Sequence, residues 1–152
     1  MKRIPFTRDG YQKLQQEKSD LEKQRVEAVI NLKTARDMGD LSENAAYKVA
    51  RSKLSSVDRR LRTVNAVISR AYVIKPLSQD TVEVGSVVYV ENNMGRRKFQ
   101  IVNSHESDVL SGKISYYSPI GQALVGKKVG SKINVKIPSG VVEYTIAKIS
   151  TD

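Results

Sequence analysis

The chain has 152 residues, enough for one or two small domains. It contains no cysteine, which excludes disulfide bonds and thiolate metal sites and fits the reducing cytoplasm in which we expect the protein. No apolar run approaches the roughly 18 residues of a membrane span, and no apolar segment follows the basic N-terminus, so we expect neither a membrane helix nor a signal peptide. The formal net charge of +10 indicates an acidic partner, such as nucleic acid or an acidic protein surface.

The positive charge is concentrated in the N-terminal half. Residues 1–75 hold 17 Lys/Arg and 9 Asp/Glu, whereas residues 76–152 hold 9 and 7. The spacing of the apolar residues changes at the same place, from the heptad pattern of helices to the shorter period of strands. We therefore predict a boundary near Lys75-Pro76, with one domain over residues 1–75 and a second over residues 79–152.

Two heptad patterns fill the first domain. Their positions alternate by three and four residues, as in a coiled coil: Tyr11, Leu14, Lys18, Leu21, Arg25, Ala28, Leu32 and Ala35, then Tyr47, Ala50, Leu54, Val57, Leu61, Val64, Ile68 and Ala71. Thr7 is the expected N-cap of the first helix, and Gly39, just past Met38, the glycine that ends it. The short connection predicts an antiparallel hairpin of two helices, each about 45 Å long at 1.5 Å per residue.

The second domain has the shorter period of β-strands. Strands are predicted over 86–91, 98–103, 113–117, 132–137 and 141–149, the first two joined by a turn at residues 92–95. A short helix is expected over 119–125, with Pro119 in its first turn. The sequence therefore predicts an α+β protein, in which a coiled-coil hairpin precedes a small β-rich domain.

Asp40 and Glu43 lie between the two helices, at the expected tip of the hairpin. Their spacing fits a capping box, with Asp40 as N-cap of the second helix and Glu43 three residues later. It also fits metal binding, because carboxylates without a nearby histidine or cysteine suit Mg²⁺. Two carboxylates are too few for a complete site, so the remaining ligands would come from another molecule. The two interpretations are compatible.

Basic residues flank this tip. Arg36 precedes it, Lys48 and Arg51 follow it, and no acidic residue occurs from Asn44 to Val57. Charged helix surfaces are usually only solvated, but coiled-coil flanks normally mix both signs of charge. Charge of one sign along a rod fits a phosphate backbone. We interpret Tyr47 as a residue of the helix seam and His105, the only histidine, as a surface loop residue.

Three motifs together resemble one family. The run ARDMGDLSENAAY at residues 35–47 is similar to the tip motif of the bacterial transcript cleavage factors GreA and GreB. The run IPFTRDGY at residues 4–11 is similar to the opening of that family, and SPIGQALVGK at residues 118–127 to its C-terminal motif. The ending, Pro138-Ser139-Gly140 followed by a strand with Glu143, is also similar. The resemblance covers essentially the whole chain.

The resemblance implies a function. Such factors are not nucleases themselves: they bind a backtracked bacterial RNA polymerase, pass the coiled coil through its secondary channel and stimulate the polymerase's own cleavage of the RNA 3′ segment. The matching tip acids are Asp40 and Glu43, which would hold a Mg²⁺ jointly with the polymerase rather than in the free protein. Arg36 and Arg51 match basic positions near the family's tip and would contact the nascent RNA 3′ end. We expect the same of Lys48, because it belongs to the same basic flank. The second domain would have an FKBP-like fold and dock on the polymerase through Ser118 and Pro119. We expect a monomer.

One departure from the family and two other functions bear on this interpretation. Many relatives carry an acid where this chain has Ala46, which would weaken metal capture. A polymerase-binding inhibitor of the same fold would lack cleavage activity, and the presence of Asp40 and Glu43 argues against it. A prolyl isomerase would need an apolar aromatic pocket. Apart from tyrosines, the second domain offers only Phe99 for such a pocket and has no tryptophan.

Overall fold

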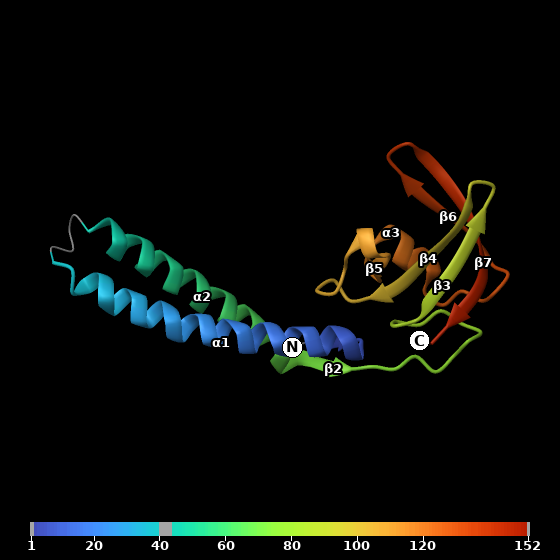
Figure 1. Ribbon diagram of the computed structural model, residues 1–152. Coiled ribbons are helices and arrows are strands. Elements are labelled where there is room, and N and C mark those ends of the chain that lie inside the picture. Colours follow the sequence, from blue (N-terminus) through green and yellow to red (C-terminus); the bar gives the residue numbers. More distant parts are fainter. Residues whose placement is uncertain (1, 40–43, 152) are drawn as a thin grey trace. The chain divides into compact units, whose positions relative to one another are not determined.

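The computed structural model describes residues 2–39 and 44–151. Contacts along the chain define two compact units, one of Gln12–Ala71 and the other of Lys2–Tyr11 together with Tyr72–Asp152. Long helices make up most of the first unit, and a curled β-sheet most of the second (Figure 1). The α+β class predicted from the sequence is confirmed.

Helices α1 (Arg8–Arg36) and α2 (Ala45–Arg70) form an antiparallel pair (Figure 1). The polar contacts between them show the direction: Glu17 of α1 binds Arg60 of α2, Arg25 binds Asp58, and the Ala35 carbonyl at the end of α1 binds Asn44 just before α2. The partner's number falls as the number along α1 rises. The predicted helical hairpin is therefore confirmed.

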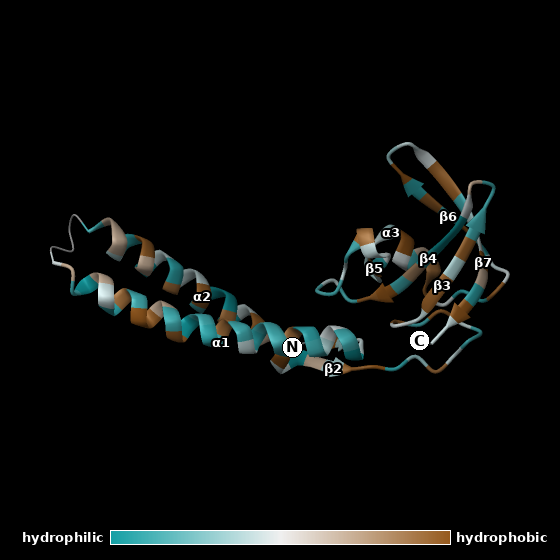
Figure 2. Cartoon of the chain, in the orientation of Figure 1, coloured by the Kyte–Doolittle hydropathy of each residue, from teal (hydrophilic) through white to brown (hydrophobic). Residues whose placement is uncertain are grey.

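The apolar seam between the helices follows the predicted heptads closely. Leu21 of α1 packs with Val57, Leu61 and Val64 of α2 in one buried cluster, and Leu14 and Ile68 pack against it. Figure 2 shows hydrophobic segments alternating with hydrophilic ones along both helices. Arg25, although it falls on the predicted seam, is exposed, and its Nε lies 2.6 Å from Asp58 Oδ1. An ion pair at the solvent edge thus accommodates a charge that the heptad alone would have buried.

The second unit is built on a five-stranded sheet with the strand order β5-β4-β3-β7-β6. Its strands are β3 (Val87–Asn92), β4 (Gly95–Val102), β5 (Lys113–Ser115), β6 (Lys132–Ile137) and β7 (Gly140–Ser150). The predicted β3–β4 hairpin is confirmed: the strands are antiparallel, and Asn92 pairs with Gly95 across the turn. Gly95 has a φ of +129°, which a residue with a side chain rarely adopts.

One face of this sheet carries the core of the unit. Alternate residues of the strands, including Val88, Val90, Ile101 and Ile146, are buried there. Helix α3 (Pro119–Leu124) covers this face, with Leu124 fully buried and Ile120 packed against the cluster. Phe99 is buried edge-on against Tyr144, so the one phenylalanine that a prolyl isomerase pocket could have used belongs to the core.

The N-terminal segment belongs to this second unit. Strand β1 (Ile4–Phe6) pairs with β2 (Ala71–Val73) in a two-stranded sheet, and Phe6 is only 1% exposed. The Phe6 ring stacks on His105, which is exposed in a loop as predicted. The sequence-based division had placed residues 2–11 with the coiled coil. The strands β1 and β2 were not predicted, because three residues are too few to show a period of two.

Candidate functional site

The predicted acidic tip falls on residues 40–43, so Asp40 and Glu43 lie outside the residues that the structure describes. Its flanks are described on both sides. Helix α1 ends at Arg36, two residues before the predicted end, and two further turn bonds follow it, from Asp37 N–H to the Lys33 carbonyl and from Met38 N–H to the Ala35 carbonyl. Gly39 then has a φ of +121°, which explains a glycine at this position.

Asn44 is the N-cap of α2. Its side-chain oxygen accepts a hydrogen bond of 3.0 Å from the backbone N–H of Tyr47, and its Nδ2 donates one of 2.6 Å to the carbonyl of Ala35. The first bond satisfies one of the free N–H groups of α2, and the second ties the start of α2 to the end of α1. The interpretation of Asp40 as the N-cap is therefore wrong, because the helix starts later than the capping-box spacing suggested.

The three basic residues predicted to bind RNA lie close to this turn. Arg36 is in the last turn of α1, and Lys48 and Arg51 are in the first two turns of α2; all three are exposed. The Arg36 guanidinium lies 5.9 Å from the centre of the Tyr47 ring. Across residues 2–39 and 44–151, none of the three forms an ion pair. No residue in these two ranges therefore neutralises the charge of Arg36, Lys48 or Arg51, and this charge is available to a partner.

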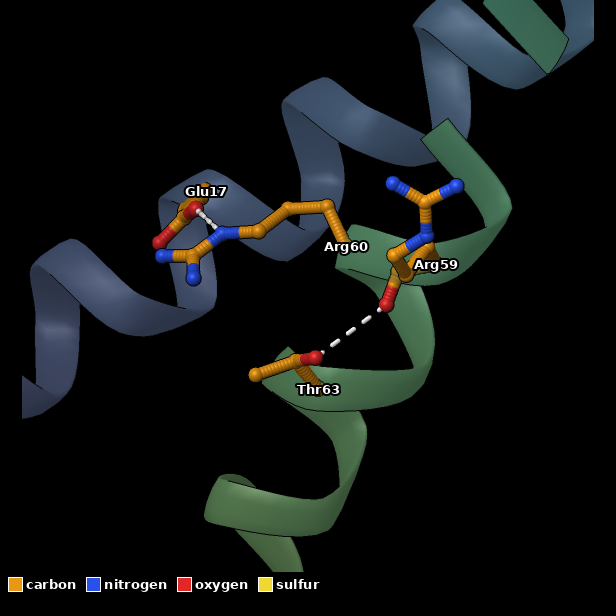
Figure 3. A network of polar contacts seen from close by, with 4 residues as sticks. All are labelled: Glu17, Arg59, Arg60 and Thr63. Carbon is orange, nitrogen blue, oxygen red and sulfur yellow. Dashed lines mark hydrogen bonds and ion pairs between the residues drawn. The ribbon is translucent and has the colours of Figure 1, made fainter. Parts of the chain in front are cut away.

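Arginines elsewhere on the hairpin are used differently. Arg60 reaches across to α1, where its Nε lies 2.5 Å from Glu17 Oε1, and this hydrogen bond raises the pKa of the guanidinium (Figure 3). Its neighbour Arg59 points away from Glu17, and Thr63 bonds to the carbonyl of Arg59 (Figure 3). Within residues 2–39 and 44–70, the hairpin thus has arginines in ion pairs around the middle of its length and cations without an ion pair next to its turn.

An apolar groove runs between the helices near the same turn. Its volume is about 490 Å³, and small residues on both helices, including Ala28, Ala35, Ala46 and Ala50, leave it open. Ala46, where the family resemblance led us to expect an acid, lies in the first turn of α2 and lines this groove. With alanine at this position, the surface beside the basic residues is apolar.

Ser118 and Pro119, predicted to dock on the polymerase, form the start of α3. The Ser118 hydroxyl accepts a bond of 3.1 Å from Gly121 N–H and donates one of 2.6 Å to the carbonyl of Ser115, so Ser118 is the N-cap. Pro119 is exposed at the first helical position, as predicted. Gly121 lies so close to the preceding loop that a Cβ on it would stand 2.1 Å from the Ser115 oxygen. The start of α3 thus packs closely against the preceding loop and is bonded to it through the Ser118 hydroxyl.

Two tyrosines that precede this loop were not predicted from the sequence as part of a functional site. Tyr116 and Tyr117 have ring centres 4.3 Å apart, and Lys2 Nζ lies 3.1 Å from the Tyr117 hydroxyl. Burial, together with the hydrogen bond to Tyr117, raises the pKa of Tyr116 to about 12. The hydrogen bond from Tyr116 and then that from Lys2 lower the pKa of Tyr117. The adjacent pair of tyrosines was the available signal, but nothing in the sequence brings Lys2 to them.

Two kinds of site are missing from the described residues. No group of three or more histidine, aspartate or glutamate side chains within residues 2–39 and 44–151 could hold a metal ion. No helix in these two ranges is long and apolar enough to cross a membrane.

Comparison with known proteins identifies the family. Residues 4–73 match the model of the N-terminal region of transcription elongation factors, and residues 77–151 the model of the C-terminal region of GreA/GreB factors. The chain is 44% identical over 154 residues to the transcription elongation factor GreA of Rhodospirillum rubrum, with 98% of each chain covered. It is 42% identical to GreA of Thermodesulfovibrio yellowstonii, with 97% of each covered. A solved structure of the GreA factor homologue Gfh1 of Thermus thermophilus is 27% identical, with 98% and 99% covered and a TM-score of 0.47. The two family models span nearly the whole sequence, and this chain therefore belongs to the GreA/GreB family of transcription elongation factors.

Proposed function

We propose that this elongation factor binds backtracked bacterial RNA polymerase and stimulates the polymerase's own cleavage of the RNA 3′ segment, which rescues arrested complexes. The chain would act as a cytoplasmic monomer and would not be a nuclease by itself. The observation that carries the proposal is the capping of α2 by Asn44. Because Asn44 caps the helix, α2 does not need Asp40 as its N-cap, which leaves both acids available for the metal-binding role that the family resemblance implies.

The donor chemistry fits a magnesium ion shared with the partner. Carboxylate oxygens are the ligands that Mg²⁺ prefers, and Mg²⁺ is commonly bound through one or two carboxylates while other ligands come from water and substrate phosphates. Asp40 and Glu43 would supply these carboxylates. When bound, a divalent cation neutralises charge on the attacking and leaving oxygens of phosphoryl displacement. The chain's own contribution is to carry the two acids to the polymerase on a rod of two paired helices.

The flanking cations would position the RNA. Arg36, Lys48 and Arg51 are exposed beside the turn and form no ion pair within the described ranges, which supports their availability to phosphates. Phosphate contacts of this kind hold a strand in register without reading its sequence. The tip would then combine two acids for the metal with a basic surround for the RNA.

Docking would use the second unit. Pro119 is exposed at the start of α3, in a loop already fixed by the Ser118 cap, so binding would cost little ordering of the loop. Pro119→Ala tests this role with less risk to the fold than a change at Ser118, because Ser118 caps the helix. Residues 2–11 pack in the same unit, so the test uses the full chain.

The decisive experiment adds the purified chain to a stalled, backtracked bacterial polymerase. We expect the labelled RNA to shorten from its 3′ end. Asp40→Asn and Glu43→Gln should each abolish most of this stimulation while leaving polymerase binding nearly intact. Asp37→Asn is the matched control, because Asp37 is an exposed acid of the same turn, and it should cleave normally.

Two outcomes would contradict the proposal. Wild-type cleavage by the Asp40→Asn variant would exclude the metal-binding role. Slower elongation by the unmodified chain without any RNA shortening would indicate a polymerase inhibitor of the same fold.

A further inference from the structure

The face of the sheet opposite α3 is strongly basic. Along β3, Val88 and Val90 are fully buried on the core side, so Tyr89 and Glu91 face the other way. The strand pairings place the remaining residues of this outer face, which we call the basic sheet face. Its cations are Arg96, Lys98, Lys113, Lys132, Lys136 and Lys148.

The centre of the basic sheet face is a row of three residues on three neighbouring strands. Tyr89 of β3 pairs with Lys98 of β4 on one side and with Lys148 of β7 on the other. The lysine Nζ atoms lie 5.9 Å and 5.6 Å from the centre of the Tyr89 ring. Cation–π attraction of this kind holds both ammonium groups beside the ring. The row therefore presents a hydroxyl group between two positive charges.

Few carboxylates lie near these charges, and Asp108, beside Lys113 at the edge of the sheet, is one of them. The outer positions of the described strands carry two acids, Glu91 and Glu143. Glu91 lies 3.7 Å from Arg96, in the next row along the strands. In the part of the chain that the structure describes, none of the five lysines forms an ion pair. Like charges kept close together without partners destabilise a sheet, so the arrangement suits an anionic ligand.

The face is also open to solvent over most of its extent. Lys98, Lys132, Lys136 and Lys148 are exposed. At one end, residues 74–76 lie near Gln100 and line a pocket of about 390 Å³ with it. Helix α3 packs against the core on the other side of the sheet. The open region thus begins at the row through Tyr89 and extends toward Arg96 and β6.

We propose that the basic sheet face binds single-stranded nucleic acid through its phosphodiester backbone, with Lys98, Tyr89 and Lys148 as the central contacts. Protein interfaces need an apolar centre, and the open region offers hardly any apolar side chain, whereas nucleic-acid interfaces are polar and positively charged. A duplex is read by helices or narrow ribbons that enter a groove about 12 Å wide. Four adjacent strands span roughly 14 Å at 4.8 Å per strand, too broad for that groove, whereas single strands do bind across sheet faces.

The proposal goes beyond transcript cleavage and is tested without polymerase. The full chain is titrated against fluorescein-labelled U20, and binding is followed by fluorescence anisotropy over a range of salt concentrations. We expect Lys98→Gln/Lys148→Gln to weaken binding at least tenfold. The slope of log K against log salt is negative, and on a single strand each lost phosphate contact reduces its magnitude by about 0.7. The double variant should therefore reduce the magnitude by about 1.4. Because no contact reads the 2′-hydroxyl, labelled dT20 should bind equally well.

Three controls make the result specific. Lys127→Gln/Lys128→Gln removes the same charge from exposed positions between α3 and β6 and should weaken binding less than twofold. Lys98→Arg/Lys148→Arg should retain binding, and equal melting temperatures should show that all variants fold. The titration is repeated in an Arg36→Ala/Lys48→Ala/Arg51→Ala background, which removes the three hairpin residues proposed to contact RNA. A failure of the basic sheet face to bind is then distinguishable from a failure of the cleavage assay.

The proposal is overturned if both double Gln variants weaken binding equally, since that would show only the effect of net charge. It is also overturned if duplex DNA or polyglutamate competes better than unlabelled U20. The second result would assign the basic sheet face to an acidic protein segment.

Discussion

The carboxylate of Glu106 accepts two hydrogen bonds from Thr7, one from its backbone N–H at 3.0 Å and one from its hydroxyl. The same carboxylate accepts a bond of 2.8 Å from Asn103 Nδ2, which also donates to the carbonyl of Pro5. Thr7 is the N-cap of α1, as predicted, and its hydroxyl accepts the N–H of Gly10. The start of the first helix is thus fixed by a loop 99 residues away.

Gly10 and Glu106 should be energetically coupled. A Cβ on Gly10 would stand 1.8 Å from Glu106 Oε1, so Gly10→Ala should displace the carboxylate and destabilise the fold. We expect Glu106→Ala alone to cost about 2–3 kcal/mol of unfolding free energy, since it removes several charge-assisted bonds. In that background, Gly10→Ala should instead stabilise by about 0.5–1 kcal/mol, because alanine is the better helix former. Urea denaturation of the four proteins measures this change of sign; a destabilising Gly10→Ala in both backgrounds would rule out the coupling.

Asn44→Ala should lower the free energy of unfolding by about 1 kcal/mol or more, because it removes the N-cap of α2. Asn44→Asp keeps the acceptor for Tyr47 N–H but removes the donor to Ala35, so its effect should be smaller. The matched control is Asp40→Ala, which should leave the melting temperature unchanged. Thermal denaturation followed by circular dichroism compares the three. A larger loss from the Asp40 variant than from Asn44→Ala would restore the capping box.

Two double arginine variants of the hairpin should distinguish residues needed for function from residues needed for stability. Arg36→Ala/Arg51→Ala removes charges without ion pairs in the described ranges, so transcript cleavage and crosslinking to the RNA 3′ end should fall while the melting temperature shifts little. Arg25→Ala/Arg60→Ala removes the same charge from ion pairs with Asp58 and Glu17. Each exposed pair contributes about 0–1 kcal/mol, so this variant should lose some stability but retain cleavage. The reverse pattern would mean that the basic flank is structural.

The tyrosine pair should titrate in a defined order. Tyr117 has a lowered pKa, so it contributes stability that increases as the pH rises through the range just below 10. Tyr116 has a pKa raised to about 12, so its contribution is lost as the pH rises from about 10 to about 12. Tyr117→Phe should lower the pKa of Tyr116 but leave it above 10, because burial is the larger cause. NMR titration of the tyrosine ring carbons measures both values, and an unchanged Tyr116 in the variant would exclude the hydrogen bond.

The helical hairpin and most strands were predictable because their patterns are long and local. The heptads place Leu21, Val57, Leu61 and Val64 in the seam where the structure has them. The strand β6 has the predicted bounds, since its alternating Ile133 and Val135 are both buried. These features depend on residues a few positions apart, which is the range that sequence periodicity covers.

The remaining features depend on contacts between distant segments. Pairing of β1 with β2 and the Thr7–Glu106 contact join residues that no local pattern relates. The predicted start of α2 was a few residues too early. Several side chains between Asp40 and Asn44 can cap a helix, and spacing alone does not choose among them. The basic sheet face was missed for a similar reason: Lys98, Tyr89 and Lys148 become neighbours only through strand pairing.

The contact between Thr7 and Glu106 also affects the order in which parts of the chain reach their native contacts during translation. The two residues are 99 positions apart, and at about 5–20 residues per second the ribosome needs roughly 5–20 s to add that length. The two long helices, joined by a short turn, can pair during this time. The first residues to be synthesised must wait for the loop at residues 103–106, and so they are among the last to reach their native contacts.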